Sequence, residues 1–252
     1  MAGRLFLVPT PLDFGCAQTV PLPDVLPQGT IVAAAGITHW ICENAKSARA
    51  FLKRVGEVQA LAVTVQQQDI QELPRAVHKK GDHAPAAFDA KPLLQAAVAG
   101  ADVGLLSEAG MPAIADPGSS VVRAAHDLGL QVVPLVGPVS LLLALAASGL
   151  NGQNFAFVGY LPQEAVARGQ RIRELEALAL RTGQAQLFIE TPYRNIALWQ
   201  GLLQALKGST RLAVASALTL PSAQCRSATA SHWKHQAAPV SSDVPAVFAI
   251  GP

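Results

Sequence analysis

The sequence has few charged residues and few cysteines, and each shortage excludes a class of protein. Only 14% of the 252 residues are charged and half are hydrophobic, which is not the composition of an intrinsically disordered chain. The formal net charge of +2 is too small for a general nucleic-acid binder that relies on bulk electrostatic attraction. The three cysteines are odd in number and widely spaced, which predicts reduced thiols in a cytoplasmic protein, with no disulfide framework and no thiolate metal site.

The sequence also lacks the long uninterrupted apolar run of a membrane span. Its first apolar run is short and meets Pro9 early, which is not typical of a signal peptide. No charged residue occurs from Leu128 to Gln163, and such a length could cross a bilayer. Prolines and glycines interrupt this segment, however, and its continuous apolar stretch Leu141–Ala147 is short. We therefore expect a soluble cytoplasmic protein with no membrane partner.

Apolar runs alternate along the chain with segments of helical periodicity, which predicts an α/β fold with mainly parallel strands. Asp116-Pro117-Gly118 is typical of a helix start, so we expect Asp116 to cap a helix that runs to Leu128. The segment 28–36 fits either a strand or a helix. Strands are expected at 4–10, 40–43, 102–107, 131–135, 154–159, 184–190, 211–217, 226–233 and 246–250. Helices are expected at 44–54, 86–99, 139–147, 164–180 and 192–206, with an exposed loop at 78–85.

The Gly- and Pro-rich segment Ala109–Pro117 interrupts this periodicity and is longer than a structural turn requires. We expect the domain boundary there, with an N-terminal α/β domain at 1–113 and a C-terminal α/β domain at 114–252. Ligands of open α/β sheets bind beyond the carboxyl ends of the strands, so this loop is also a candidate binding loop. The sequence has neither a Gly-x-Gly-x-x-Gly motif after its first strand nor a Walker motif, so nothing supports dinucleotide or triphosphate binding.

Three glutamates follow predicted strands, where a carboxylate could take the proton of a hydroxyl nucleophile. Each could equally be a carboxylate favoured by the N-terminus of the next helix. We predict Glu43 and Glu190 as catalytic candidates. Substrate contacts are predicted from Lys46, Arg49, Glu108, Tyr193 and Arg194, although the cations could also be ordinary residues of a helix surface. The histidines at 232 and 235 have no third ligand nearby, and no metal site is predicted.

Five ordered segments carry a family resemblance. They are Leu7-Val-Pro-Thr-Pro11, Leu105–Gly118, Pro134–Pro138, Ser148–Leu150 with Phe155–Pro162, and Phe188–Arg194. They resemble the tetrapyrrole (corrin/porphyrin) methylase superfamily, and most closely its ribosomal RNA small-subunit 2′-O-methyltransferase I branch. The resemblance implies two α/β domains, with S-adenosylmethionine in the cleft between them, and usually a homodimer.

The resemblance further implies that backbone and small apolar side chains hold the cofactor, which fits the uncharged Gly/Pro loops. The positions that match the family's cofactor contacts are Leu12, Gly110, Met111, Pro112, Ile114, Val139, Ser140, Ile189, Ala215, Pro245 and Ala246.

The chain departs from the ribosomal branch at charged positions. The usual Glu-Asp-Thr-Arg is Glu43-Asn-Ala-Lys46 here, and the late Glu-Leu-Thr-Lys is Ala217-Leu-Thr-Leu220. Three classes of function therefore stay open. The favoured one is S-adenosylmethionine-dependent methylation of small-subunit ribosomal RNA. The others are methylation of a tetrapyrrole or other small molecule, and S-adenosylmethionine binding without turnover.

Overall fold

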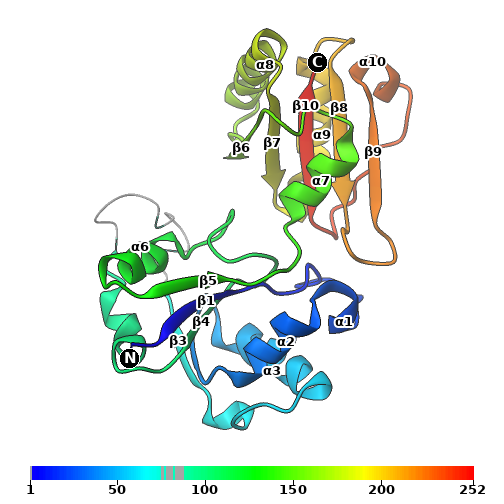
Figure 1. The fold of residues 1–252 in the computed structure, drawn as a ribbon. Coiled ribbons are helices and arrows are strands. Elements are labelled where there is room, and N and C mark those ends of the chain that lie inside the picture. The colour runs from blue at the N-terminus through cyan, green and yellow to red at the C-terminus, as the bar shows by residue number, and fades with distance from the viewer. Residues whose placement is uncertain (1, 75–76, 78–81, 83–87) are drawn as a thin grey trace. The chain divides into compact units, whose positions relative to one another are not determined.

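The computed structural model describes residues 2–74, 77, 82 and 88–252, which form two compact units. The first unit consists of Met1–Phe14 and Val20–Val139, and the second consists of Gly15–Thr19 and Ser140–Pro252. Each unit contains a five-stranded sheet with helices packed against it (Figure 1). The predicted α/β class with two α/β domains is therefore confirmed.

The division between the units lies later in the chain than the sequence predicts. The contacts divide the chain at Val139/Ser140, not at 113/114. The reason is the strand β5 (Gln131–Pro134), which pairs in parallel with the first strand, β1 (Arg4–Val8). The long Gly/Pro loop is thus an internal loop of the first unit.

All strands of the first sheet are parallel. Their order is β3-β2-β4-β1-β5, where β2 is His39–Cys42, β3 is Asp69–Glu72 and β4 is Val103–Leu106. Helices cover both faces, so a central strand such as β4 is buried along its whole length and reads as an apolar run. Because the strands are parallel, the residues that follow β1, β2, β4 and β5 gather at one edge of this sheet.

Helices lie on both faces of the first sheet (Figure 1), and a cluster of buried hydrophobic side chains packs on each face. On one face Phe6 and Trp40 contact the helices α1 (Leu22–Val25), α2 (Gln28–Gly36) and α3 (Ala45–Val58). On the other face Leu5 and Ile41 contact η2 (Lys91–Leu94), α5 (Gln95–Val98) and α6 (Ser119–Asp127). The short helix η1 (Val65–Gln67) precedes β3. The ambiguous segment 28–36 is thus helical. The helix expected from 86 begins at Lys91, while 86–87 lie outside the described residues.

The second sheet is mixed, so the expectation of mainly parallel strands is wrong for this unit. Its order is β6-β7-β10-β8-β9, and β10 (Ala246–Gly251) is antiparallel to both neighbours, β7 (Ala185–Glu190) and β8 (Arg211–Ser216). The edge strand β6 (Phe155–Tyr160) is parallel to β7. The other edge strand, β9 (Gln224–Thr229), is antiparallel to β8, because the connection between them is too short for a crossover helix.

Helices again cover both faces of the second sheet (Figure 1). α7 (Ser140–Ser148) lies against one face, where the strands present small side chains such as Ala213 and Ala249. The opposite face carries the main core, in which the rings of Phe188 and Phe248 stack with centroids 6.0 Å apart. The remaining helices are α8 (Ala165–Thr182), η3 (Pro192–Arg194), α9 (Asn195–Ala205) and α10 (Ala230–Trp233).

The segment expected as a strand at 226–233 is a strand only to Thr229. The Thr229 hydroxyl accepts a hydrogen bond from the backbone N–H of His232 and so caps α10, which turns the chain away from the sheet. Among the described residues, no helix is both long enough and apolar enough to span a bilayer.

Candidate functional site

Two loops of the first unit are tied together at the carboxyl edge of its sheet. Thr10, in the loop after β1, exchanges two backbone hydrogen bonds with Gly110, in the loop after β4, at 3.0 and 3.1 Å. The Thr10 hydroxyl also donates to the carbonyl oxygen of Ser107 at 3.2 Å. A Cβ atom placed on Gly110 would lie 3.1 Å from Cδ2 of Leu12. The predicted cofactor residues Leu12 and Gly110 are therefore in direct proximity.

The loop after β4 has a strained backbone. Ala113 and Ala115 both have φ of 64°, in the left-handed region, where a residue with a Cβ is disfavoured by about 1–2 kcal/mol. Gly110 and Gly118 also have positive φ, of 80° and 136°. Such strain persists only where the surroundings impose it, and it clusters at ligand-binding and catalytic sites. This loop is thus a candidate binding loop on structural grounds as well.

A hollow of about 440 Å³ opens beside this loop, and its size is within the range of small-molecule pockets. Met111, Pro112 and Ile114, three predicted cofactor residues, line it together with side chains of β1, β5 and α6. The lining is mostly apolar, so the hollow suits an uncharged part of a ligand.

Three carboxyl groups lie close together at the same edge. Glu43 follows β2, Glu108 follows β4, and Asp116 lies in the strained loop. The backbone N–H of Glu108 donates to Glu43 Oε1 at 3.4 Å, and the Ser47 hydroxyl donates to Glu108 Oε1 at 3.2 Å. Within the described part of the chain, no group of three or more His, Cys, Asp or Glu side chains could hold a metal ion.

The cluster shifts the pKa of two of its members. Burial first, and then the negative charges of Asp116 and Glu108, raise the pKa of Glu43 to about 7. Burial raises the pKa of Asp116 to about 6, with the Ser107 hydroxyl opposing the shift and the charge of Glu108 adding to it. Glu43 can therefore both take up and release a proton near neutral pH.

The prediction that Asp116 caps α6 is wrong. The capping carboxylate belongs to Asp82, which accepts the backbone N–H groups of Gly118 and Ser120, both at 2.9 Å. The hydroxyls of Ser119 and Ser120 also donate to it, at 2.8 and 2.6 Å. α6 begins after Gly118, which has no side chain to cap it, so the carboxylate comes from a distant segment. The expected exposed loop 78–85 lies mostly outside the described residues, but Asp82 itself is buried.

Basic side chains follow the cluster on α3. Asn44 caps this helix by accepting the backbone N–H of Lys46 at 2.9 Å. Lys46, Arg49 and Lys53 are exposed and stand three and four residues apart, so they form one stripe along the helix. The substrate candidates Lys46 and Arg49 thus lie on the first turns of α3, the helix that begins two residues after Glu43. Arg54, the next cation, is instead paired with Asp13.

In the second unit, the predicted cofactor residues meet at one end of β10. Ala246 lies between Glu190 of β7 and Ser216 of β8, and the next residue, Val247, lies between Ile189 and Ala215. The carbonyl oxygen of Pro245 accepts the backbone N–H of Ala217 at 3.1 Å. The loop that Ala217 begins is strained too, since the φ values of Ala217 and Thr219 are 52° and 70°. The last two predicted contacts stand where the units divide, Val139 ending the first and Ser140 beginning α7.

Glu190, the second catalytic candidate, is bound to a cation. Its side chain is only 2% exposed and forms an ion pair with Arg194, at 2.8 Å from Nη2 and 3.0 Å from Nε. The backbone N–H of Thr191 donates to the same oxygen at 2.8 Å. Arg194 also lies 5.1 Å from the ring centre of Tyr193, which is 70% exposed. This arrangement favours a structural role for Glu190 and leaves Tyr193 accessible.

One buried residue of this edge was not predicted from the sequence. Asn195 is fully buried at the start of α9 and donates to the carbonyl oxygens of Ser241 and Val244, at 3.1 and 3.0 Å. It thereby fixes the segment that leads into Pro245. Its only sequence signal was a polar residue after Thr-Pro-Tyr-Arg, which is also typical of an ordinary helix start.

Comparison with known proteins matches residues 29–232 to the family model of Tetrapyrrole (Corrin/Porphyrin) Methylases. The ribosomal RNA small subunit methyltransferase I of Mesorhizobium japonicum is 34% identical over 226 residues, which are 89% of this chain and 67% of that protein. The protein of the same name from Escherichia coli O157:H7 is 27% identical over 217 residues, 86% of this chain and 66% of that protein. The chain thus matches about two thirds of the length of these two relatives.

Two solved structures share the fold over nearly the whole chain. The methyltransferase CobJ covers 99% of this chain and 94% of its own, with a TM-score of 0.56 and 15% identity. The uroporphyrin-III-C-methyltransferase from Thermus thermophilus covers the same shares, with a TM-score of 0.50 and 15% identity. At this identity the likeness concerns the fold.

Proposed function

Because the chain belongs to the tetrapyrrole (corrin/porphyrin) methylase family, we propose that it is an S-adenosylmethionine-dependent methyltransferase that methylates a ribose 2′-hydroxyl of small-subunit ribosomal RNA. The names of its relatives support this substrate. The observation that carries the proposal is the placement of Glu43, a carboxyl group with a pKa of about 7, at the carboxyl end of β2 and just before α3, the helix that bears the exposed Lys46, Arg49 and Lys53.

The residues of the first unit fit the cofactor in chemical terms. Gly110 leaves the backbone open to close approach, and Met111, Pro112 and Ile114 offer apolar surface. The contacts proposed from the second unit are Ile189, Ala215, Pro245 and Ala246. Val139 and Ser140, at the point of the chain where the units divide, are proposed as further contacts. When bound, S-adenosylmethionine supplies a methyl group activated by its sulfonium.

Replacement of Gly110 tests this binding loop. Gly110→Val should weaken binding of S-adenosylhomocysteine about tenfold, because a β-branched residue is strained at φ of 80° and meets Leu12. Isothermal titration calorimetry measures the affinity. Gly129→Val is the matched control, since Gly129 has φ of 69° but open space around its Cα. Equal affinities of the two variants would move the cofactor site elsewhere.

The mechanism requires a positioned hydroxyl and a proton acceptor. Transfer of the methyl group to the hydroxyl oxygen would break the carbon–sulfur bond of the sulfonium and release S-adenosylhomocysteine, and the ionised Glu43 carboxylate would accept the proton that the hydroxyl loses. Holding the reacting atoms in line supplies much of the rate acceleration. Burial, together with the charges of Asp116 and Glu108, raises the pKa of Glu43 to about 7, so its carboxylate accepts a proton more readily than an ordinary glutamate and can still release it near neutral pH.

The stripe of Lys46, Arg49 and Lys53 is the proposed phosphate contact of the RNA. Reversing two charges, as in Lys46→Glu with Arg49→Glu, should abolish methylation of small-subunit particles while affinity for S-adenosylhomocysteine stays almost unchanged. A matched control reverses two exposed lysines of the second unit, Lys207 and Lys234. If the control loses as much activity as the test variant, the stripe is not the RNA contact.

The decisive experiment is transfer of a tritiated methyl group from S-adenosylmethionine into material from cells that lack the protein. Small-subunit particles, naked RNA and small-molecule extracts are tested in parallel. Label in the particles or the RNA supports the proposal. Label only in the small-molecule extract would establish the alternative substrate class, and tight cofactor binding without label anywhere would indicate a binding protein.

We also propose that the protein is a cytoplasmic homodimer. Apolar side chains exposed on β6 and α7 support this, among them Phe155, Tyr160 and Leu142, which are 42%, 56% and 51% exposed. Light scattering at micromolar concentration should give twice the chain mass of 26.2 kDa. A mass equal to that of one chain would refute the dimer.

A further inference from the structure

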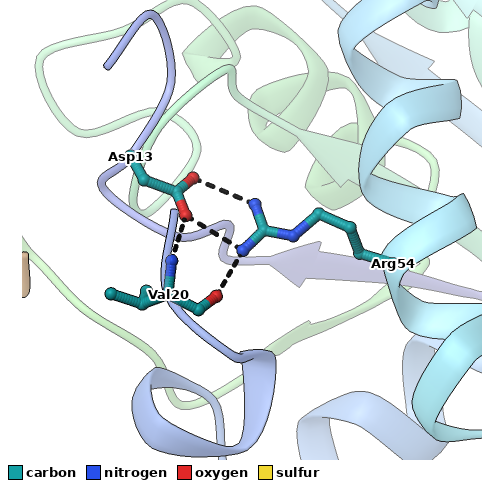
Figure 2. A network of polar contacts seen from close by, with 3 residues as sticks. All are labelled: Asp13, Val20 and Arg54. Carbon is teal, nitrogen blue, oxygen red and sulfur yellow. Dashed lines mark hydrogen bonds and ion pairs between the residues drawn. The ribbon is translucent and has the colours of Figure 1, made fainter. Parts of the chain in front are cut away.

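A buried ion pair in the first unit holds the loop that follows β1. The Arg54 guanidinium on α3 donates from Nη1 to Asp13 Oδ1 at 3.0 Å and from Nη2 to Asp13 Oδ2 at 2.9 Å (Figure 2). The same Nη2 donates to the carbonyl oxygen of Val20 at 2.6 Å, and the backbone N–H of Val20 donates to Asp13 Oδ2 at 3.1 Å. The four bonds join three segments of the chain at one point, and we call this group the Asp13–Arg54 clamp.

The clamp fixes both ends of one loop. Asp13 and Val20 are buried, whereas most residues between them are exposed, so the clamp ties the two ends of this loop to each other. On the other side of Leu12, Thr10 is bound to Gly110 by two backbone hydrogen bonds. Leu12 thus stands between two anchors, and its Cδ2 atom lies against Gly110.

The clamp fixes the geometry of its residues more than it stabilises the fold. Removing a carboxylate and a guanidinium from water costs free energy that their attraction often only balances. The Asp13 side chain is 5% exposed and that of Arg54 is 27% exposed, so this cost applies here. In return, a two-point contact between planar groups fixes both distance and orientation.

The same unit holds a second two-point pair, Arg4 with Asp102, at the amino edge of the sheet. Its side chains are 48% and 33% exposed, and it stands where β1 and β4 begin, away from the candidate site. The two pairs have the same chemistry but different burial and location. Arg4–Asp102 is therefore a control for effects that depend on the location of the Asp13–Arg54 clamp beside Leu12.

We propose that Asp13 and Arg54 are positioning residues for cofactor binding, which hold Leu12 in place against Gly110. This inference rests on the proposed function, since it requires that the protein bind S-adenosylmethionine or its product. Because it is paired with Asp13, Arg54 is not among the cations proposed to contact RNA, although its neighbour in the sequence, Lys53, is.

The test is a double-mutant cycle between Arg54 and Leu12, with the dissociation constant of S-adenosylhomocysteine as the readout. Arg54→Met and Leu12→Ala should each raise the dissociation constant by about tenfold, because a small displacement of a contact residue is costly. The double variant should lose little more than either single variant, because Arg54 acts through Leu12. Arg54→Lys should lose less than Arg54→Met, since lysine keeps the charge without the two-point contact.

Thermal unfolding of every variant separates positioning from general destabilisation. Arg4→Met should leave the dissociation constant unchanged, whatever it does to the melting temperature. If Arg54→Met does not fold, the cycle is run with Arg54→Lys and Asp13→Asn. Unchanged affinity in a folded Arg54 variant, or losses that simply add in the double variant, would overturn the inference. Failure of the unaltered protein to bind the ligand would instead overturn the proposed function, and with it this inference.

Discussion

Glu43 and Glu190 occupy equivalent places in their two sheets, yet their surroundings differ in charge. Glu43 directly follows β2 and Glu190 is the last residue of β7, so each lies where a candidate binding loop begins. Glu43 is half-buried beside Glu108 and Asp116, and these charges add to burial in raising its pKa to about 7. Glu190 is buried beside Arg194, which neutralises it, and beside the N–H of Thr191. Two carboxylates at equivalent strand ends thus have opposite neighbours, namely carboxyl groups around Glu43 and a guanidinium against Glu190.

The largest expected effect separates the two glutamates by activity. Glu43→Gln should lower kcat about 10²–10⁴-fold, because an amide cannot accept the hydroxyl proton. Its melting temperature should stay the same or rise, since one member of a repelling cluster loses its charge. Glu190→Gln should keep most of the kcat of folded protein. Single-turnover methyl transfer measures both, and a larger loss in the Glu190 variant would reverse the comparison.

The next effect compares the cation beside Glu190 with an exposed cation of α3 by their contributions to the free energy of unfolding. Arg194→Met leaves the Glu190 carboxylate buried without its cation, which should lower the free energy of unfolding by about 3 kcal/mol. Arg49→Met, on the exposed face of α3, should change it by less than about 0.5 kcal/mol. Urea unfolding measures both values. Equal effects of the two substitutions would show that the Glu190–Arg194 pair contributes nothing that an exposed cation does not.

The pH dependence of kcat should follow the protonation of Glu43. Below its pKa of about 7, kcat should fall about tenfold per pH unit, because the protonated carboxyl cannot act as a base. Its pKa is higher in the folded state than the ordinary value of 4.5, so its contribution to stability is present below pH 4.5 and is lost as the pH rises through 7. Glu43→Gln should remove this part of the stability profile. A kcat that is flat from pH 5 to 8 would contradict the role of Glu43.

The smallest effect comes from the neighbour of Glu43. Asp116→Asn removes a negative charge that helps to raise the pKa of Glu43, so the midpoint of the kcat profile should move to lower pH by less than about one unit. Lys91→Gln, a change of one charge elsewhere in the same unit, serves as the control and should leave the midpoint in place. A shift to higher pH in the Asp116 variant would show that Asp116 does not act on Glu43 through its charge.

Local sequence patterns predict the strands and the loops at their ends, because apolar runs and Gly/Pro punctuation are local signals. They predict β4 and the loop with Gly110 for this reason. The same patterns miss what depends on distant partners. Nothing near β10 shows that it lies between β7 and β8, and nothing near β5 shows that it pairs with β1.

In the candidate site too, local sequence predicts some features, while others depend on distant residues. The position of Glu43 at a strand end is readable from the sequence, but its raised pKa is not, since two of its causes lie more than 60 residues away. By sequence, Arg54 resembles the other basic residues of α3, but in the structure it forms an ion pair with Asp13. Asp116 fits the local pattern of a helix cap, but the carboxylate that accepts the backbone N–H of Gly118 is that of Asp82. In each case a long-range polar contact decides among roles that the local sequence leaves equal.

Asp82 holds the C-terminal end of the strained loop through the backbone N–H groups of Gly118 and Ser120. Hydrogen exchange at these two amides therefore depends on whether Asp82 is bound. Burial alone raises the pKa of Asp82, but the bonds from Ser120, Gly118 and Ser119 outweigh it and leave the pKa below its usual value. Their stabilising contribution is therefore lost as the pH falls through that lowered pKa. When Asp82 detaches, the amides of Gly118 and Ser120 lose their acceptor and become open to solvent. The exchange rates of these two amides thus report how often the loop that carries Gly110 is released at its far end.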